Sequence, residues 1–197
     1  MNPSGADGAP PQDRKAAFRS MLRREALEWA QSIAIALVLT LIIRTFIIQA
    51  FKIPSGSMIP TLEVGDKLFV SKYVYRFHPP ERGDIVVFRF PGDKKKDFIK
   101  RVAAFGGETI EIRDEKIYVD GRELDDPRNF GRFRYFNHDP FAGPNEKVRV
   151  PEDHLYVLGD NSANSTDSRF WGFVPMKNVL GKAVFRWWPP SRIGRIE

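Results

Sequence analysis

Two patterns of hydrophobic positions divide this chain. Residues 29–43 form an apolar stretch without a charge, whereas the chain beyond residue 66 alternates apolar and polar residues in short runs. A long apolar stretch is typical of a helix in an apolar environment, and period-two alternation is typical of half-buried strands. The sequence therefore predicts one N-terminal helix followed by a mainly β domain.

The apolar stretch and its continuation predict a transmembrane helix. A helix from residue 29 to residue 51 would span about 34 Å, which is enough to cross a bilayer. Arg44 interrupts the stretch, so we expect it near one interface with its guanidinium turned outward. A cleavable signal peptide and a buried core helix are the alternatives, but the stretch lacks a small-residue cleavage site and a polar face. We assign residues 26–50 to a single transmembrane helix.

Basic residues before this helix predict its orientation. Residues 14–24 contain five arginines and lysines, and the Gly/Pro/Ala-rich residues before them are expected to be disordered. Residues 1–25 are therefore a partly disordered basic tail, which the positive-inside rule places in the cytoplasm. We expect a single-pass protein of the cytoplasmic (inner) membrane. The lipid bilayer is then a partner, and residues 51–197 form a domain on the extracytoplasmic or periplasmic side.

Short runs rich in Val, Ile, Phe and Tyr predict the strands of that domain. Gly and Pro separate the runs, and no stretch after residue 51 shows helical periodicity. Residues 108–124 alternate strictly, which predicts a hairpin with a turn at residues 113–115 and a second turn at Asp120-Gly121. We predict an all-β, barrel-like domain in which residues 125–147 are a loop-rich insertion. Other strands are expected at residues 67–73, 84–90, 97–105, 154–159 and 179–189.

Composition excludes several classes of site. The 197 residues contain no cysteine, so a disulfide framework, a thiol nucleophile and a cysteine-ligated metal are excluded. The net charge of +6 is mild, and the basic residues alternate with acids, so we expect no nucleic-acid partner. The acidic residues lack the spacing of a calcium loop. We therefore expect neither a metal nor a cofactor.

The first candidate for chemistry is the loop of residues 51–62, FKIPSGSMIPTL. Its two prolines exclude a helix or a central strand, and Gly56 allows a tight path between Ser55 and Ser57. The pattern predicts a rigid loop that displays a hydroxyl group. An ordinary Pro/Ser/Gly turn fits equally well, and a serine nucleophile needs a base from elsewhere in the chain.

Lys100 is the best candidate for that base. The three histidines lack a convincing aspartate partner for a Ser-His-Asp triad. Lys100 lies inside a predicted strand, where it shares a face with Phe98 and Val102 while Arg101 points the other way. Apolar neighbours disfavour the charged amine and lower its pKa. A lysine that keeps an edge strand soluble remains the competing interpretation.

A polar loop at residues 159–172, GDNSANSTDSRFWG, is the second candidate for chemistry. Ser165 is suited to orient a neutral lysine amine, and Asp167 with Arg169 is suited to form an ion pair that fixes the loop. The alternative is a turn-rich loop in which Asp and Asn bond their own backbone.

Four stretches together resemble a known family, the type I signal peptidases. These are membrane-bound Ser-Lys serine proteases that remove signal peptides from exported preproteins. The stretches PSGSMIPTL, RGDIVVF, DFIKRVAAFGGE and GDNSANSTDSRFWG resemble the family's successive motifs and follow one another in the family's order after an apolar stretch. The resemblance covers nearly all of residues 29–189.

The resemblance implies a role for each matching residue. Ser57 would be the nucleophile and Lys100 the general base, with Ser55 and the Ser57 backbone N–H holding the oxyanion. Ser165 would orient Lys100, and Asp167 with Arg169 would brace the loop. The implied partners are signal peptides of secreted preproteins, with the export translocon nearby. Shallow apolar pockets that select small residues would be lined by Phe51, Ile53, Val87, Phe98 and Ile99.

One departure and two alternatives accompany the resemblance. Ser162-Ala163 stands where many members have Arg-Asp, which removes two charges from the supporting loop. A related Ser-Lys maturation protease is one alternative function. The other is a non-catalytic, membrane-tethered β domain that binds a partner.

Overall fold

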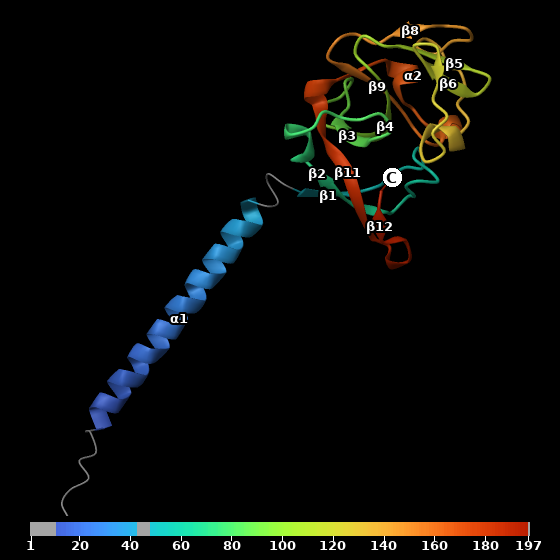
Figure 1. The fold of residues 1–197 in the computed structure, drawn as a ribbon. Coiled ribbons are helices and arrows are strands. Elements are labelled where there is room, and N and C mark those ends of the chain that lie inside the picture. Colours follow the sequence, from blue (N-terminus) through green and yellow to red (C-terminus); the bar gives the residue numbers. More distant parts are fainter. Residues whose placement is uncertain (1–10, 43–47, 197) are drawn as a thin grey trace, which may run out of the picture. The chain divides into compact units, whose positions relative to one another are not determined.

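A computed structural model describes residues 11–42 and 48–196 of the chain. Contacts divide the chain into two compact units, Met1–Thr45 and Phe46–Glu197. The first unit contains α1 (Pro11–Ile42). The second contains the strands and the short helix α2 (Ser168–Trp171) (Figure 1).

The helix α1 differs from the predicted transmembrane segment at both ends. It begins at Pro11, so residues 11–25 of the basic tail are helical, while residues 1–10, which are expected to be disordered, lie outside the described residues. Residues 48–50, the end of the predicted segment, belong to a strand instead. Arg44 lies outside the described residues. Among the helices of residues 11–42 and 48–196, none combines the length and apolar content needed to span a membrane.

Strand pairing explains why residues 48–50 are not helical. Strand β1 (Ile48–Lys52) pairs antiparallel with β2 (Lys67–Ser71), from Ile48 opposite Ser71 to Lys52 opposite Lys67. Five residue pairs satisfy backbone groups through the sheet, and a hydropathy window does not detect such long-range bonds. The β domain therefore begins earlier than the predicted boundary at residue 51.

The described strands form two antiparallel sheets, which confirms a mainly β protein. In the larger sheet the spatial order is β1-β2-β11-β3-β4-β9-β10, with β12 beside β11. Its further strands are β3 (Ile85–Arg89), β4 (Asp97–Phe105), β9 (His154–Leu158), β10 (Val174–Pro175), β11 (Val179–Trp188) and β12 (Gly194–Arg195). The smaller sheet has the order β7-β6-β5-β8. It consists of β5 (Thr109–Arg113), β6 (Lys116–Val119), β7 (Arg122–Glu123) and β8 (Val148–Arg149).

The predicted hairpin of residues 108–124 is confirmed. Arg113 pairs with Lys116, and Val119 pairs with Arg122. The φ angles at Asp114 and Glu115 are 51° and 61°, and that at Asp120 is 49°. Such left-handed turn residues match the right-handed twist of the paired strands.

The two faces of β3 and β4 pack in different hydrophobic clusters. Ile85, Val87 and Ile99 join a cluster with Met58 and Leu62. Phe88, Phe98 and Val102 are among the side chains of a second cluster, on the opposite face of the same strands. The period-two alternation of the sequence therefore corresponds to a sheet covered on both faces.

Residues 125–147 are more than a loop at the rim of the domain. Phe130, Tyr135 and Ala142 from this segment are buried in a third cluster with Ile110, Ile112 and Tyr156. Its regular structure among the described residues is one 3-10 turn, Phe130–Arg132, and one isolated bridge between His138 and Ala142. The segment thus has few strand signals but supplies core side chains. Other 3-10 turns are Val74–Arg76, Ser162–Asn164, Met176–Asn178 and Pro190–Arg192.

Candidate active site

The loop that contains Ser57 connects β1 to β2 and is anchored by buried apolar side chains. Two backbone hydrogen bonds close it, from Ile53 N–H to the Asp66 carbonyl and from Gly65 N–H to the Ile53 carbonyl, both 2.9 Å. Ile53, Met58 and Leu62 are buried in the cluster that also contains Ile85 and Val87 of β3. The hydrophobic positions of the loop therefore fix a backbone that the prolines keep out of regular structure.

Asn161 from the loop after β9 binds the carbonyl groups on both sides of the Ser57 Cα. Its backbone N–H donates to the Ser57 carbonyl at 3.0 Å, and its Nδ2 donates to the Gly56 carbonyl at 3.0 Å. Thr61 Oγ1, further along the serine loop, donates to Asp160 Oδ2 at 2.5 Å. The two polar loops are thus joined by three hydrogen bonds.

Lys100 meets Ser57 in a buried contact. Its Nζ donates to Ser57 Oγ at 2.7 Å and to the Ile99 carbonyl at 3.0 Å. The two residues are 4% and 6% exposed. Strand β4 lies between β3 and β9, so the interpretation of Lys100 as an edge-strand lysine is wrong. The lysine shares its strand face with Phe98 and Val102, as the alternation predicts.

Burial changes the protonation of this amine. Desolvation lowers the pKa of Lys100 to about 8, against smaller upward effects of the Asp167 and Asp160 carboxylates, while the Arg169 guanidinium lowers it further. About a tenth of the molecules would then carry a neutral amine at pH 7. An uncharged nitrogen at hydrogen-bond distance from a hydroxyl can accept its proton.

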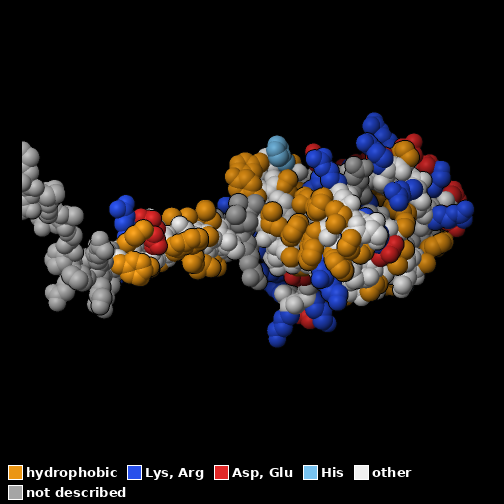
Figure 2. All heavy atoms as spheres, turned by 90° about the horizontal axis from the view of Figure 1, so that it is seen from below, with side chains coloured by type: hydrophobic (Ala, Val, Ile, Leu, Met, Phe, Trp, Pro, Cys, Tyr) orange, Lys and Arg blue, Asp and Glu red, His pale blue; other side chains and the backbone are white. Residues whose placement is uncertain are grey.

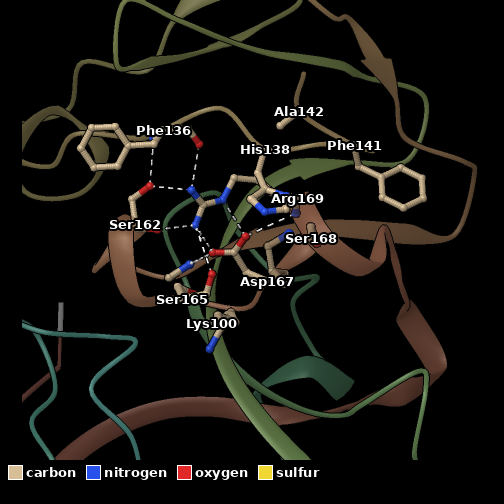
Figure 3. A network of polar contacts seen from close by, with 12 residues as sticks. Lys100, Phe136, His138, Phe141, Ala142, Ser162, Ser165, Asp167, Ser168 and Arg169 are labelled. Atoms are coloured by element: carbon tan, nitrogen blue, oxygen red, sulfur yellow. Dashed lines mark hydrogen bonds and ion pairs between the residues drawn. The ribbon is translucent and has the colours of Figure 1, made fainter. Parts of the chain in front are cut away.

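Asp167 and Arg169 form the ion pair expected in the polar loop (Figure 3). Arg169 Nε lies 2.8 Å from Asp167 Oδ1, and both side chains are buried. Asp167 also accepts the N–H of Gly159 at 2.9 Å and the N–H of Arg169, which caps the first turn of α2. The pair therefore ties the start of the loop to its end.

Ser165 lies close to the pair but does not bond the lysine. Its Oγ is buried, and no described residue offers it a hydrogen-bond partner. A Cβ built on Gly159 would lie 2.1 Å from Ser165 Oγ and 2.5 Å from the Ser57 carbonyl oxygen, so both serines pack on this glycine. In Figure 3 Ser165 is drawn between Lys100 and the Asp167–Arg169 pair.

The residues expected to line the pocket divide between two clusters. Phe51, Ile53, Val87 and Ile99 belong to the cluster under the serine loop. Phe98 lies on the other face, where its ring stacks on Phe90 at 4.5 Å. The Lys100 amine nevertheless lies 5.6 Å from the Phe98 ring centroid. Ser55 is exposed, and its hydroxyl makes no hydrogen bond to a described residue.

Sequence reasoning missed a second buried ion pair beside the site. Arg101 Nε and Nη2 each lie 2.8 Å from one oxygen of Asp160, and both side chains are fully buried. The sequence placed Arg101 on the face opposite Lys100 but assigned it no partner. Asp160 lies in the polar loop, so the available signal was a basic residue in an apolar strand and an acidic residue in that loop.

The described contacts leave the histidines out of this site. The ring nitrogen of His138 contacts the Asp139 carbonyl and that of His154 contacts the Glu152 carbonyl, while His78 is exposed. Among the described residues, Ser57 therefore takes part in no Ser-His-Asp triad.

Gly159 has no room for a side chain, because Ser165 and the Ser57 backbone pack directly against it. We expect Gly159→Ala to lower the free energy of unfolding by about 1–3 kcal/mol, because the added methyl group overlaps Ser165 and the Ser57 backbone. Gly194→Ala is the matched control, since a Cβ there meets nothing within 4 Å. Thermal unfolding of both variants provides the measurement. Equal midpoints for the two variants would contradict the expected overlap.

Comparison with known proteins gives the site its context. The chain matches the family described as signal peptidase, peptidase S26, over residues 26–188. It is 40% identical to signal peptidase I of Leptolyngbya laminosa over 94% of this chain and 91% of that protein. It is 44% identical to the probable signal peptidase I-1 of Synechocystis, over 82% of each chain, and 38% identical to signal peptidase I of Bacillus caldolyticus, over 82% of this chain and 90% of that protein. The chain therefore belongs to the signal peptidases of family S26 and is a serine-type peptidase.

Proposed function

We propose that this chain cleaves signal peptides from exported preproteins with Ser57 as the nucleophile and Lys100 as the general base. The observation that carries the proposal is the 2.7 Å contact between Lys100 Nζ and Ser57 Oγ in a buried site. A non-catalytic binding domain has no need of a desolvated amine aimed at a hydroxyl.

The reaction follows from this geometry. The neutral amine of Lys100 accepts the Ser57 proton while Oγ attacks the carbonyl carbon of the scissile peptide bond. The tetrahedral intermediate then breaks its C–N bond, and the leaving amine takes a proton from the Lys100 ammonium. Water, deprotonated by Lys100, attacks the resulting ester; the C–Oγ bond then breaks, the Lys100 ammonium returns the proton to Ser57 Oγ, and the signal peptide is released with a free carboxylate. The Ser57 N–H and the exposed Ser55 hydroxyl stabilise the oxyanion.

Residues around the lysine support this role. Asp167 and Arg169 hold the polar loop by a buried ion pair, and Ser165 occupies the space beside the amine. Ser165 orients Lys100 when the amine turns from Ser57 during the reaction. Every one of these groups is supplied by the chain, and the mechanism needs no cofactor.

The apolar residues near the serine loop are suited to select substrates with small side chains at the cleavage site. Ile53 and Val87 are buried in one cluster, and Phe51 and Ile99, which are only partly buried, pack against it. A shallow apolar surface of this kind accepts a methyl group and offers no room for a larger side chain. Phe98 lies on the opposite face of β4 from Ile99. Because its ring is close to the Lys100 amine, it adds to the apolar surface on the lysine side of the site.

Membrane attachment through the N-terminal unit places the enzyme beside its substrates. The apolar side chains of α1 are exposed over residues 33–41 (Figure 2). The hydroxyls of Ser32 and Thr40 donate to carbonyls four residues earlier, so these groups remain satisfied in lipid. We place residues 26–42 of α1 in the cytoplasmic membrane, with the N-terminus in the cytoplasm. The β domain is then extracytoplasmic, near the export translocon.

Substitution of either reacting residue tests the assignment. We expect Ser57→Ala and Lys100→Ala each to reduce preprotein cleavage by about 10³-fold or more, because each removes one of two groups that act as a unit. Lys94→Ala, at an exposed lysine shortly before the same strand, is the control and should keep full activity. Cleavage of a labelled preprotein by detergent-purified enzyme gives the rates. Wild-type activity in a folded Ser57 or Lys100 variant removes that residue from its role.

The pKa of Lys100 predicts how the rate depends on pH. Only the neutral amine accepts a proton, so kcat/KM should rise with pH through about 8 and level off above it. Well below pH 8, kcat/KM should fall about tenfold per pH unit. Initial rates from pH 6 to pH 10 provide the measurement. A profile that is flat across this interval would show that no base of this kind limits the reaction.

Membrane attachment is tested by extraction. Because exposed apolar side chains of α1 would be buried in lipid, alkaline carbonate should leave the full chain in the membrane pellet. The matched variant carries Leu37→Glu and Leu41→Glu, two charges that disfavour insertion, and it should move to the supernatant. Release of the wild-type chain by carbonate would contradict the proposed attachment.

A further inference from the structure

Two buried arginines flank the reacting pair, and every guanidinium nitrogen of each has a partner. Arg169 gives Nε and Nη2 to Asp167, while Nη2 also donates to the Ser162 carbonyl at 2.8 Å. Arg101 gives Nε and Nη2 to Asp160. In both arginines the remaining nitrogen, Nη1, points away from the carboxylate.

Segment 125–147 binds that remaining nitrogen in both cases. Arg101 Nη1 donates to Asn129 Oδ1 at 2.8 Å, besides the Gly83 carbonyl. Arg169 Nη1 donates to the Phe136 carbonyl at 2.8 Å. Ser162 Oγ joins the same group, since it accepts from Arg169 Nη1 at 2.6 Å and from the Phe136 N–H at 2.9 Å (Figure 3). One stretch of the insertion therefore contacts both ion pairs.

We propose that residues 129–136 are a positioning clamp for the general base. Through Asn129 and Phe136 they hold Arg101 and Arg169 against Asp160 and Asp167, and so keep both carboxylates neutralised beside the Lys100 amine. Asn129 and Ser162 are positioning residues, because they act on the lysine through the arginines. The inference rests on the proposed function of Lys100 and extends it to a segment without an assigned role.

The charged groups around Lys100 determine whether a loosened clamp raises or lowers the pKa of its amine. The groups around the amine are Ser57 Oγ, the Ile99 carbonyl and the Phe98 ring, together with the charges of Asp160, Asp167 and Arg169. A loosened clamp leaves the carboxylates less neutralised and moves the Arg169 cation away. It also admits water to the site. Each change favours the ammonium form, so all three raise the pKa of Lys100.

The segment is anchored independently of these hydrogen bonds, which makes the clamp testable. Phe130, Tyr135 and Ala142 are buried in the cluster that also holds the smaller sheet. Loss of the Asn129 amide or the Ser162 hydroxyl therefore removes contacts to the arginines while the apolar anchors remain. Asn129 is only half-buried, so Asn129→Ala is expected to fold.

The experiment compares pH profiles of the full chain in detergent, with a peptide that contains a signal-peptide cleavage site as substrate. We expect Asn129→Ala and Ser162→Ala each to raise the midpoint of the pH profile of kcat/KM by about 0.5 to 1 pH unit. Cleavage would then fall about 3- to 10-fold at pH 7 and recover above pH 9.5. Lys147→Gln, in the same segment but exposed, is the control and should keep the wild-type midpoint.

Three outcomes separate the possibilities. An upward shift with recovery at high pH supports the clamp. An unchanged midpoint overturns it, even if the thermal unfolding temperature falls, because a purely structural role does not move the titration. If Ser162→Ala does not fold, the pH profile of Asn129→Ala alone shows whether the midpoint shifts or stays unchanged. A wild-type profile without a rise near pH 8 would instead contradict the base role of Lys100, and the two failures are thereby distinguished.

Discussion

The structure depends on keeping a lysine amine away from water and from any carboxylate partner. An ammonium in a medium of low polarity is costly unless an acid pairs with it. Lys100 has a hydroxyl and a carbonyl as its hydrogen-bond acceptors, and the two acids whose charges raise its pKa, Asp160 and Asp167, are each bound by an arginine. The balance between burial and these neighbouring charges lowers the pKa to about 8, which keeps the neutral form accessible.

This constraint explains why the amine comes from a central strand. A side chain on β4 has neighbouring strands on both sides and apolar clusters on both faces of the sheet, so its amine is desolvated without a special cavity. The serine, in contrast, comes from a loop. Its backbone is fixed by buried apolar side chains and by Asn161, which leaves the hydroxyl to meet the lysine.

Three regions far apart along the chain converge on this contact. The serine loop follows β1, the polar loop follows β9, and residues 129–136 come from the insertion between β7 and β8 of the smaller sheet. The buried arginines join them, since Arg101 links the lysine strand to Asp160 and Asn129, and Arg169 links the polar loop to Phe136. Such fully paired buried networks specify one arrangement, because any partial arrangement leaves charges unsatisfied.

The sequence by itself determined the local elements, and its resemblance to the signal peptidases singled out Ser57 and Lys100 as candidates for the reaction. The strand at Asp97–Phe105 and the hairpin turns follow from alternation and turn chemistry, which are properties of neighbouring residues. Local pattern did not determine whether Lys100 was buried, that residues 48–52 form a strand, or that residues 125–147 supply core side chains. Only the tertiary structure decided these points, as each depends on pairing between residues distant in sequence: β3 and β9 around the lysine, β2 beside β1, and the arginines on the insertion.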